Sequence, residues 1–141
     1  MNQRGFTLME MLVVILLISL AAGLLGLGVR QGLQAAKEHR VVGEMVDALR
    51  ATRAGAVIGG KAARTEFDLQ RLTFQAPGRA LKRWPPELQV TVESAGVLGA
   101  AVEFYPDGSS TGGNLLVANG SRRWRIDIGW LTGSVQSRAL P

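Results

Sequence analysis

The sequence reads Gly5-Phe6-Thr7-Leu8-Met9-Glu10 near its N-terminus, and residues 11–29 follow without a single charged side chain. Leu, Val and Ile dominate this uncharged stretch. A helix needs roughly 20 consecutive apolar residues to cross the hydrocarbon core of a bilayer. The stretch is therefore long enough to form a membrane-spanning helix.

A cleaved secretory signal peptide is the competing interpretation of this segment. Such peptides have an apolar core of about 7–15 residues that ends at a small-residue cleavage site. Ala21-Ala22-Gly23 could mimic that site, but four more leucine and valine residues follow before the first charge at Arg30. The length of the run favours a retained anchor.

The pattern Gly5-Phe6-Thr7-Leu8-x-Glu10 before an uncharged span resembles the N-terminal signal of type IV pilins and pseudopilins. The resemblance implies that a prepilin peptidase removes residues 1–5 as a leader and methylates the new N-terminal Phe6. It also implies that residues 6–29 form a helix that spans the inner membrane and later enters a filament core. Residues 30–141 would then form a periplasmic domain, with the N-terminus cytoplasmic before processing.

The presence of Glu10 at the edge of the apolar stretch requires an explanation, because a carboxylate in a membrane-spanning helix costs about 3 kcal/mol at the bilayer centre. Cleavage after Gly5 would create an amine at Phe6, one helical turn away. The resemblance implies that Glu10 meets the amine of a neighbouring subunit during filament docking, and an opposite charge offsets burial. The alternative is that Glu10 lies at the lipid interface.

Charge near the span does not favour this topology. Arg4 precedes the apolar stretch, whereas Arg30, Lys37 and Arg40 follow it. The positive-inside rule alone would place the C-terminal part in the cytoplasm. The periplasmic location therefore rests on the resemblance.

Beyond the anchor, the apolar spacing predicts that the helix continues. Val42, Met45, Val46 and Leu49 share one helical face. Glycines at positions 55, 59 and 60 predict an end near Ala54. His39 falls among Lys37, Glu38 and Arg40, on what should be a solvated face.

The remainder predicts antiparallel strands, which makes the fold class α+β. Alternating polar and apolar residues indicate strands near residues 65–69, 72–74, 88–93, 102–104, 115–118, 123–128 and 134–136. Asn119-Gly120 favours a two-residue hairpin turn. Three prolines between residues 76 and 87 indicate a loop.

The segment from Val102 to Gly113, with Tyr105-Pro106-Asp107-Gly108 inside it, resembles a hallmark of H-type minor pseudopilins and the related FimT-type minor pilins. Residues 126–128 and 131–135 continue the resemblance. It implies a pilin-like fold in which the long helix packs on a two-sheet β-sandwich. It also implies a structural subunit of the type II secretion pseudopilus, which drives export of folded exoproteins. The implied partners are major and minor pseudopilins, the prepilin peptidase and the inner-membrane assembly platform.

A FimT-type pilin of a type IV pilus, involved in assembly or DNA uptake, is the alternative. The net charge is +5, and a candidate basic surface consists of Arg122, Arg123, Arg125 and Arg138. On a strand, Arg123 and Arg125 point to the face opposite Trp124 and Ile126. A solvated sheet face has the same pattern without DNA, so we do not expect a nucleic-acid partner.

The sequence contains few residues of the kinds that enzymes use for catalysis. It has no cysteine and one histidine, which makes a metal site or a catalytic triad a poor prospect. The glycine-rich segment at 108–113 lacks the lysine of a phosphate-binding loop and the spaced carboxylates of a calcium loop. Ser109 and Ser110 have no nearby histidine base. We expect a non-enzymatic protein without metal or cofactor, and a tight structural turn at this segment.

Overall fold

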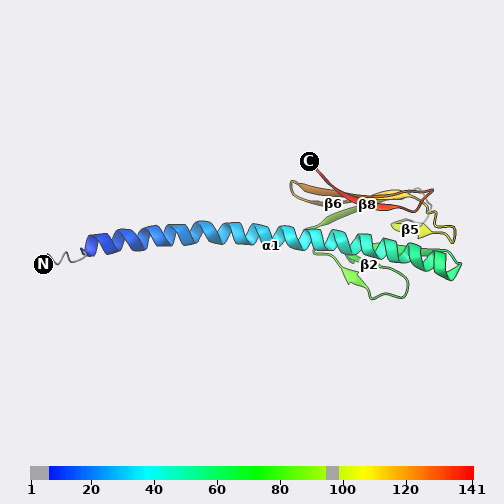
Figure 1. Cartoon of the computed structure of the whole chain (residues 1–141), viewed down its shortest axis with the longest axis horizontal. Coiled ribbons are helices and arrows are strands. Elements are labelled where there is room, and N and C mark those ends of the chain that lie inside the picture. The colour runs from blue at the N-terminus through cyan, green and yellow to red at the C-terminus, as the bar shows by residue number, and fades with distance from the viewer. Residues whose placement is uncertain (1–6, 95–98) are drawn as a thin grey trace. The chain divides into compact units, whose positions relative to one another are not determined.

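The computed structural model describes the backbone of residues 7–94 and 99–141, and the side chains of these residues except 24–31. One helix, α1 (Leu8–Gly59), precedes all the strands of this described part (Figure 1). The strands are β1 (Ala63–Asp68), β2 (Thr73–Gln75), β3 (Lys82–Arg83), β4 (Gln89–Glu93), β5 (Ala101–Phe104), β6 (Gly113–Asn119), β7 (Arg122–Ile128) and β8 (Val135–Leu140). The chain divides into two compact units, Met1–Lys37 and Glu38–Pro141.

In the first unit, the described residues are the beginning of α1. Thr7 precedes the helix, and the Glu10 amide donates hydrogen bonds to the Thr7 carbonyl at 3.0 Å and to its hydroxyl at 3.3 Å. Thr7 therefore acts as the N-cap, since its oxygens satisfy an amide that has no partner within the helix. The large apolar side chains from Leu8 to Leu20 are exposed.

A search of the described residues finds no helical stretch with the length and apolar character that a membrane crossing requires. The transmembrane helix at residues 6–29 stays a prediction from the sequence.

In the second unit, α1 buries the face that the apolar spacing predicted. Met45 and Leu49 are completely inaccessible to solvent, and Val42 and Val46 are nearly so. The helix does not end near Ala54 but continues to Gly59. Tertiary packing holds the extended part: Ala56 is fully buried, and one turn before it the Thr52 hydroxyl contacts the Thr65 hydroxyl of β1 at 2.7 Å. These tertiary contacts outweigh the weak helix propensity of glycine at position 55.

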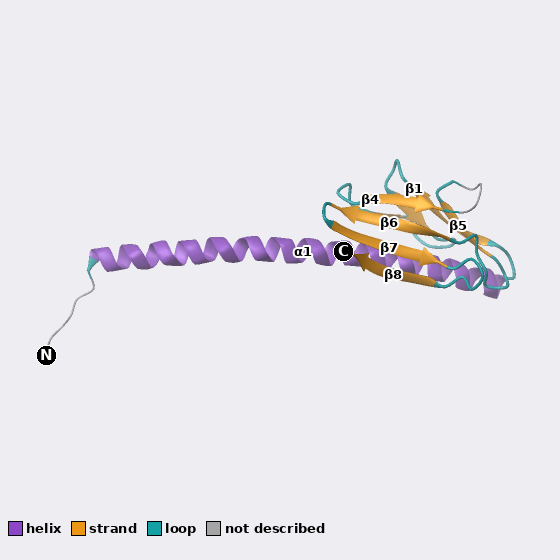
Figure 2. Cartoon of the chain, turned by 90° about the horizontal axis from the view of Figure 1, so that it is seen from above, coloured by secondary structure: helices purple, strands orange, loops and turns teal. Residues whose placement is uncertain are grey.

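The strands form two four-stranded sheets, ordered β3-β2-β1-β5 and β4-β6-β7-β8, in which every neighbouring pair is antiparallel. Figure 2 shows the second sheet with its strands in this order. Both sheets and the second half of α1 contribute to one hydrophobic core. Its completely buried side chains include Phe104, Leu115 and Ile126. The predicted fold class, a long helix packed on an antiparallel two-sheet sandwich, is confirmed.

Three local predictions were inaccurate. Strand β3 lies inside the region predicted as a loop, where the neighbouring Trp84 is buried and its amide donates to the Leu72 carbonyl. Strand β8 extends to Leu140, although its exposed polar residues gave little alternation to detect. The hairpin turn is Gly120-Ser121 and not Asn119-Gly120, because Asn119 pairs with Arg122 as the last residue of β6.

Candidate functional site

The segment that carries the H-type resemblance begins with a tight turn after β5. The Gly108 amide donates to the Tyr105 carbonyl, and the Tyr105 amide donates to the Ser109 carbonyl, both at 2.9 Å. Asp107 accepts hydrogen bonds from the Ser109 hydroxyl at 2.6 Å and from its amide at 2.9 Å. These hydrogen bonds lower the pKa of Asp107. The carboxylate thus stabilises the turn. The sequence predicted a tight turn at this segment but not this role of Asp107.

This turn packs against the connection between β7 and β8, residues 129–134. The Ser110 amide donates to the Trp130 carbonyl at 2.8 Å, and the Ser110 hydroxyl donates to the Gly129 carbonyl at 3.1 Å. Arg53 of α1 donates from Nε to the Gly108 carbonyl at 3.1 Å. A Cβ at Gly133, where φ is +59°, would lie 2.1 Å from that same carbonyl oxygen. The backbones approach so closely that only glycine fits there.

Of the residues predicted to act at the N-terminus, the structure describes only Glu10. Gly5 and Phe6, the predicted residues of leader cleavage and methylation, lie outside the described residues. Glu10 lies in the first turn of α1, and its side chain is exposed. Its role in filament docking stays a prediction.

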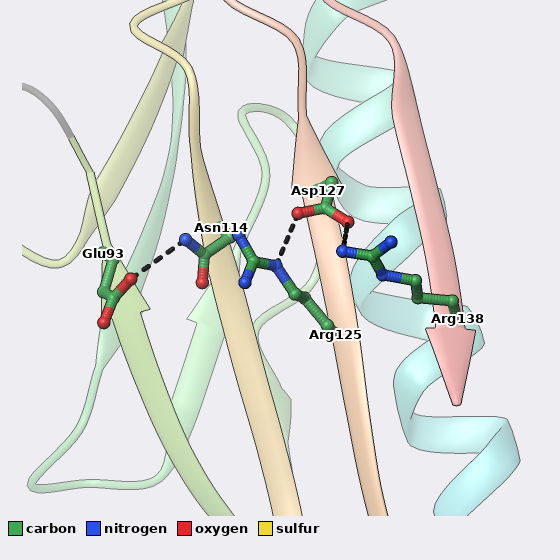
Figure 3. A network of polar contacts seen from close by, with 5 residues as sticks. All are labelled: Glu93, Asn114, Arg125, Asp127 and Arg138. Carbon is green, nitrogen blue, oxygen red and sulfur yellow. Dashed lines mark hydrogen bonds and ion pairs between the residues drawn. The ribbon is translucent and has the colours of Figure 1, made fainter. Parts of the chain in front are cut away.

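The arginines on β7 lie as the strand alternation predicted. Trp124 and Ile126 are buried, while Arg123 and Arg125 are on the opposite face. Figure 3 shows Asp127 accepting from Arg125 Nε at 2.6 Å and pairing with Arg138 Nη2 at 3.3 Å. One carboxylate therefore sits between two of the four candidate basic residues.

The outer face of this sheet carries further polar groups. Asn114 Nδ2 donates to Glu93 Oε2 at 3.0 Å on the neighbouring strands (Figure 3). Arg123 Nη2 donates to the Pro141 carbonyl at 2.7 Å. The face is thus of mixed charge, with acidic side chains among the arginines.

Arg122 is engaged by a carboxylate that the sequence did not reveal. Glu38 was predicted on a solvated helix face, but only 3% of its side chain is exposed. Its Oε1 accepts from Arg122 Nη2 at 2.9 Å and from Asn119 Nδ2 at 2.6 Å. No local pattern identifies this cluster, because Glu38 lies far along the chain from Asn119 and Arg122, which are close together on the β6–β7 hairpin.

The other residues of that helix turn behave as predicted. His39 is exposed, and its ring contacts Trp124 edge to face at a centroid distance of 5.7 Å. Within the described residues, no three His, Asp or Glu side chains come together as metal ligands.

Comparison with known proteins places the chain in a family. The model of the prokaryotic N-terminal methylation motif matches residues 1–26. Type II secretion system protein H of Xanthomonas campestris pv. campestris is 34% identical over 142 aligned residues, which cover 97% of this chain and 84% of that protein. The chain belongs to the family of type II secretion system protein H. The resemblance to H-type pseudopilins is therefore confirmed.

A solved structure of this kind has the same fold. The minor pseudopilin EpsH from the type 2 secretion system of Vibrio cholerae matches with a TM-score of 0.57 and 12% identity. The match covers 73% of this chain and 97% of that one. At this identity the likeness supports the pilin-like fold and nothing finer. In this chain, the packed turn at Gly108 and Gly133 is the structure that the segments carrying the resemblance adopt.

Proposed function

We propose that this chain is a minor pseudopilin, a structural subunit of the type II secretion pseudopilus that drives export of folded exoproteins across the outer membrane. The observation that carries the proposal is 34% identity to a type II secretion system protein H over 97% of the chain. The methylation motif at residues 1–26 supports the same assignment.

In this proposal the prepilin peptidase cuts after Gly5 and methylates Phe6. Residues 6–29 then anchor the subunit in the inner membrane as a single span, with residues 30–141 in the periplasm. The partners are the other major and minor pseudopilins and the inner-membrane assembly platform. Glu10 pairs with the N-terminal amine of a neighbouring subunit as the helix enters the filament.

A structural role agrees with the environment of the side chains that could act chemically. The hydroxyl of Ser109 donates to Asp107, and that of Ser110 donates to the Gly129 carbonyl. Neither serine contacts a histidine, since His39 packs against Trp124. The FimT-type alternative with DNA binding gains no support from Arg125 and Arg138, because both pair with Asp127.

Deleting the gene in its own bacterium tests the proposal. We expect exoproteins to accumulate in the periplasm instead of the medium, and a plasmid copy of the wild-type gene to restore export. Pilus-dependent motility and DNA uptake should not change. Normal export together with lost motility or DNA uptake would favour the type IV pilus instead.

A further inference from the structure

The two sheets have four edge strands, and within the described residues two of these edges are closed. In the first sheet, β3 is only two residues long, and both residues are charged. The outer edge of β5 is occupied by the segment that follows it, because the Thr111 amide donates to the Glu103 carbonyl at 2.9 Å. The two open edges, β4 and β8, lie on opposite sides of the second sheet (Figure 2).

Strand β4 does not have the usual protection of an edge strand. It contains no proline or lysine, its register with β6 is unbroken, and its one charged residue, Glu93, lies at its end. No described backbone group outside β6 forms a hydrogen bond with the backbone of β4. On β8, the Val135 carbonyl accepts from Arg50 Nη2 at 3.0 Å, but residues 136–139 are exposed beyond it. Both edges are therefore available to another strand.

The backbone groups of the two edges point outward at matching positions. The Val135 carbonyl accepts from the helix, so it points away from β7. In antiparallel sheets, the side on which a residue forms hydrogen bonds alternates along each strand and across each row of paired residues. Ser137 and Ala139 therefore also point their N–H and C=O groups outward. The register connects Ser137 across the sheet to Val92, and Ala139 to Val90. The backbone groups of both valines consequently point away from β6.

Each strand has a fixed direction relative to the end at which the chain enters the unit, which we refer to as the entry end. Glu38 marks this end and contacts the β6–β7 hairpin. Strand β4 begins there, since Gln89 pairs with Ala118 near the hairpin. Strand β8 finishes there, since Leu140 pairs with Arg123. When two copies are anchored in one membrane, both entry ends face that membrane. The β4 of one copy and the β8 of the other are then antiparallel, whereas two like edges would be parallel and would pair less stably.

Antiparallel pairing of these unlike edges brings compatible side chains together. On the inner face, the two half-buried valines of β4 each gain a small neighbour, Ser137 or Ala139. On the outer face, Glu93 comes diagonal to Arg138, and opposite charges in this arrangement attract each other. No like charges lie opposite each other. The pairs on the outer face are Glu93 with Gln136, Thr91 with Arg138, and Gln89 with Leu140.

We infer that the β4 edge of one copy pairs with the β8 edge of a second copy, which extends the second sheet from one subunit to the next. The inference rests on the proposed function, because that function anchors all copies in one membrane with the same orientation. Val92 and Val90 exchange backbone hydrogen bonds with the second copy's Ser137 and Ala139. The contact joins two different surfaces, so it is heterologous and can repeat from copy to copy.

Disulfide cross-linking of the full-length protein in the secreting bacterium tests the inference, since the chain has no cysteine of its own. Gln89→Cys and Leu140→Cys lie opposite each other in the inferred pairing. Within one chain, three strand spacings of about 14 Å in total separate β4 from β8. A disulfide needs Cα atoms within about 7 Å, so only a bond between two copies can form. We expect the double variant to give dimers and larger species after mild oxidation, and each single variant to stay monomeric.

The other outcomes of this experiment count against the inference. Dimers of Gln89→Cys alone, or of Leu140→Cys alone, would mean that like edges meet. Leu81→Cys with Leu140→Cys is the control for random collisions, because Leu81 is exposed but precedes β3. Equal cross-linking of this control, dimers from a single variant, or a monomeric double variant would each overturn the inference.

A proline variant tests whether the contact uses the backbone. Val92→Pro, added to the two cysteines, removes an N–H that points away from β6, and edge strands tolerate proline at such positions. We expect the cross-linked fraction to fall about tenfold, the effect of losing one backbone hydrogen bond at the contact. Val92→Ala keeps the N–H and should leave the fraction unchanged. Protease resistance shows that each variant is folded, and Ser137→Pro tests the same contact from β8 if Val92→Pro is not folded. An unchanged cross-linked fraction in a folded proline variant would overturn the inference.

Export after gene deletion is measured separately, which distinguishes the two proposals. Export that is lost on deletion, together with a monomeric double-cysteine variant, would overturn the inference and leave the proposed function supported. Normal export after deletion would instead overturn the proposed function.

Discussion

Glu38 of α1 and Arg122 of β7 are 84 residues apart in the sequence, yet Oε1 and Nη2 lie 2.9 Å apart. The Glu38 carboxylate is buried, and among the described residues its Oε1 accepts hydrogen bonds from Arg122 and Asn119 alone. Its second oxygen, Oε2, is also buried and has no hydrogen-bond partner within the part of the chain that the structure describes. The pair thus joins the helix to the β6–β7 hairpin at the point where α1 enters the second unit.

Removing Arg122 should therefore destabilise the domain. Arg122→Ala leaves a buried carboxylate with a single donor, and we expect a loss of about 1–3 kcal/mol in the free energy of unfolding. Urea denaturation of a fragment starting at Arg30 measures it. The control is Arg40→Ala, because Arg40 pairs with Glu44 on the surface and such pairs contribute about 0–1 kcal/mol. Equal effects of the two substitutions would show that the Glu38 pair contributes no more than a surface pair.

Trp124 and Trp130 give a matched pair of tryptophan substitutions. Trp124 is 5% exposed and Trp130 is 69% exposed. Trp124→Ala should cost about 3–5 kcal/mol, as truncation of a large core side chain does. Trp130→Ala should change stability by no more than about 0.5 kcal/mol. Urea denaturation of the two variants decides, and a small effect at Trp124 would contradict its place in the core.

Processing is checked on the protein extracted from membranes. Mass spectrometry should show an N-methylated Phe6 as the first residue. Gly5→Ala should be cleaved almost normally because alanine is still small, whereas Gly5→Leu should block cleavage. An intact Met1, or a new N-terminus near Gly23, is incompatible with a prepilin leader.

Glu10→Ala should leave cleavage intact but reduce incorporation into the filament. The hydrogen bonds of Glu10 to Thr7 use the backbone amide of Glu10, so the substitution keeps the start of the helix. What it removes is the charge that would pair with a neighbour's amine. Shearing and immunoblotting measure incorporation into the filament. If Glu10→Ala is incorporated as well as the wild type, Glu10 is only an interface residue.

DNA binding by the domain should be weak and limited to low salt, because phosphate contacts by a few arginines are readily screened. A gel-shift titration across salt concentrations compares wild type with Asp127→Ala, which frees Arg125 and Arg138. We expect the variant to bind more tightly at low salt. Micromolar binding of the wild type at physiological salt, lost in an Arg123→Ala, Arg125→Ala, Arg138→Ala variant, would favour the DNA-uptake pilin. Arg122 is left intact because it also pairs with Glu38.

Much of the fold could be predicted from the sequence because the relevant signals are local. The spacing of Met45 and Leu49 identified the buried helical face, and alternation identified Trp124 as core and Arg123 as surface. Both patterns follow from the repeat of the backbone itself, 3.6 residues in a helix and two in a strand. Element boundaries were less accurate, since tertiary contacts extended α1 to Gly59 and added β3.

The sequence by itself determined the class of protein: the motif from Gly5 to Glu10, the uncharged stretch after it, the amphipathic helix and the alternating strands. The tertiary structure alone decided which polar groups are engaged. Asp127 lies between Arg125 and Arg138, Glu38 is buried against Arg122, and Arg53 reaches Gly108. Arg125 and Asp127 are close neighbours on one strand face, but the other partners lie on different elements, and no local pattern encodes a pairing that forms only when two sheets and a helix close on one core.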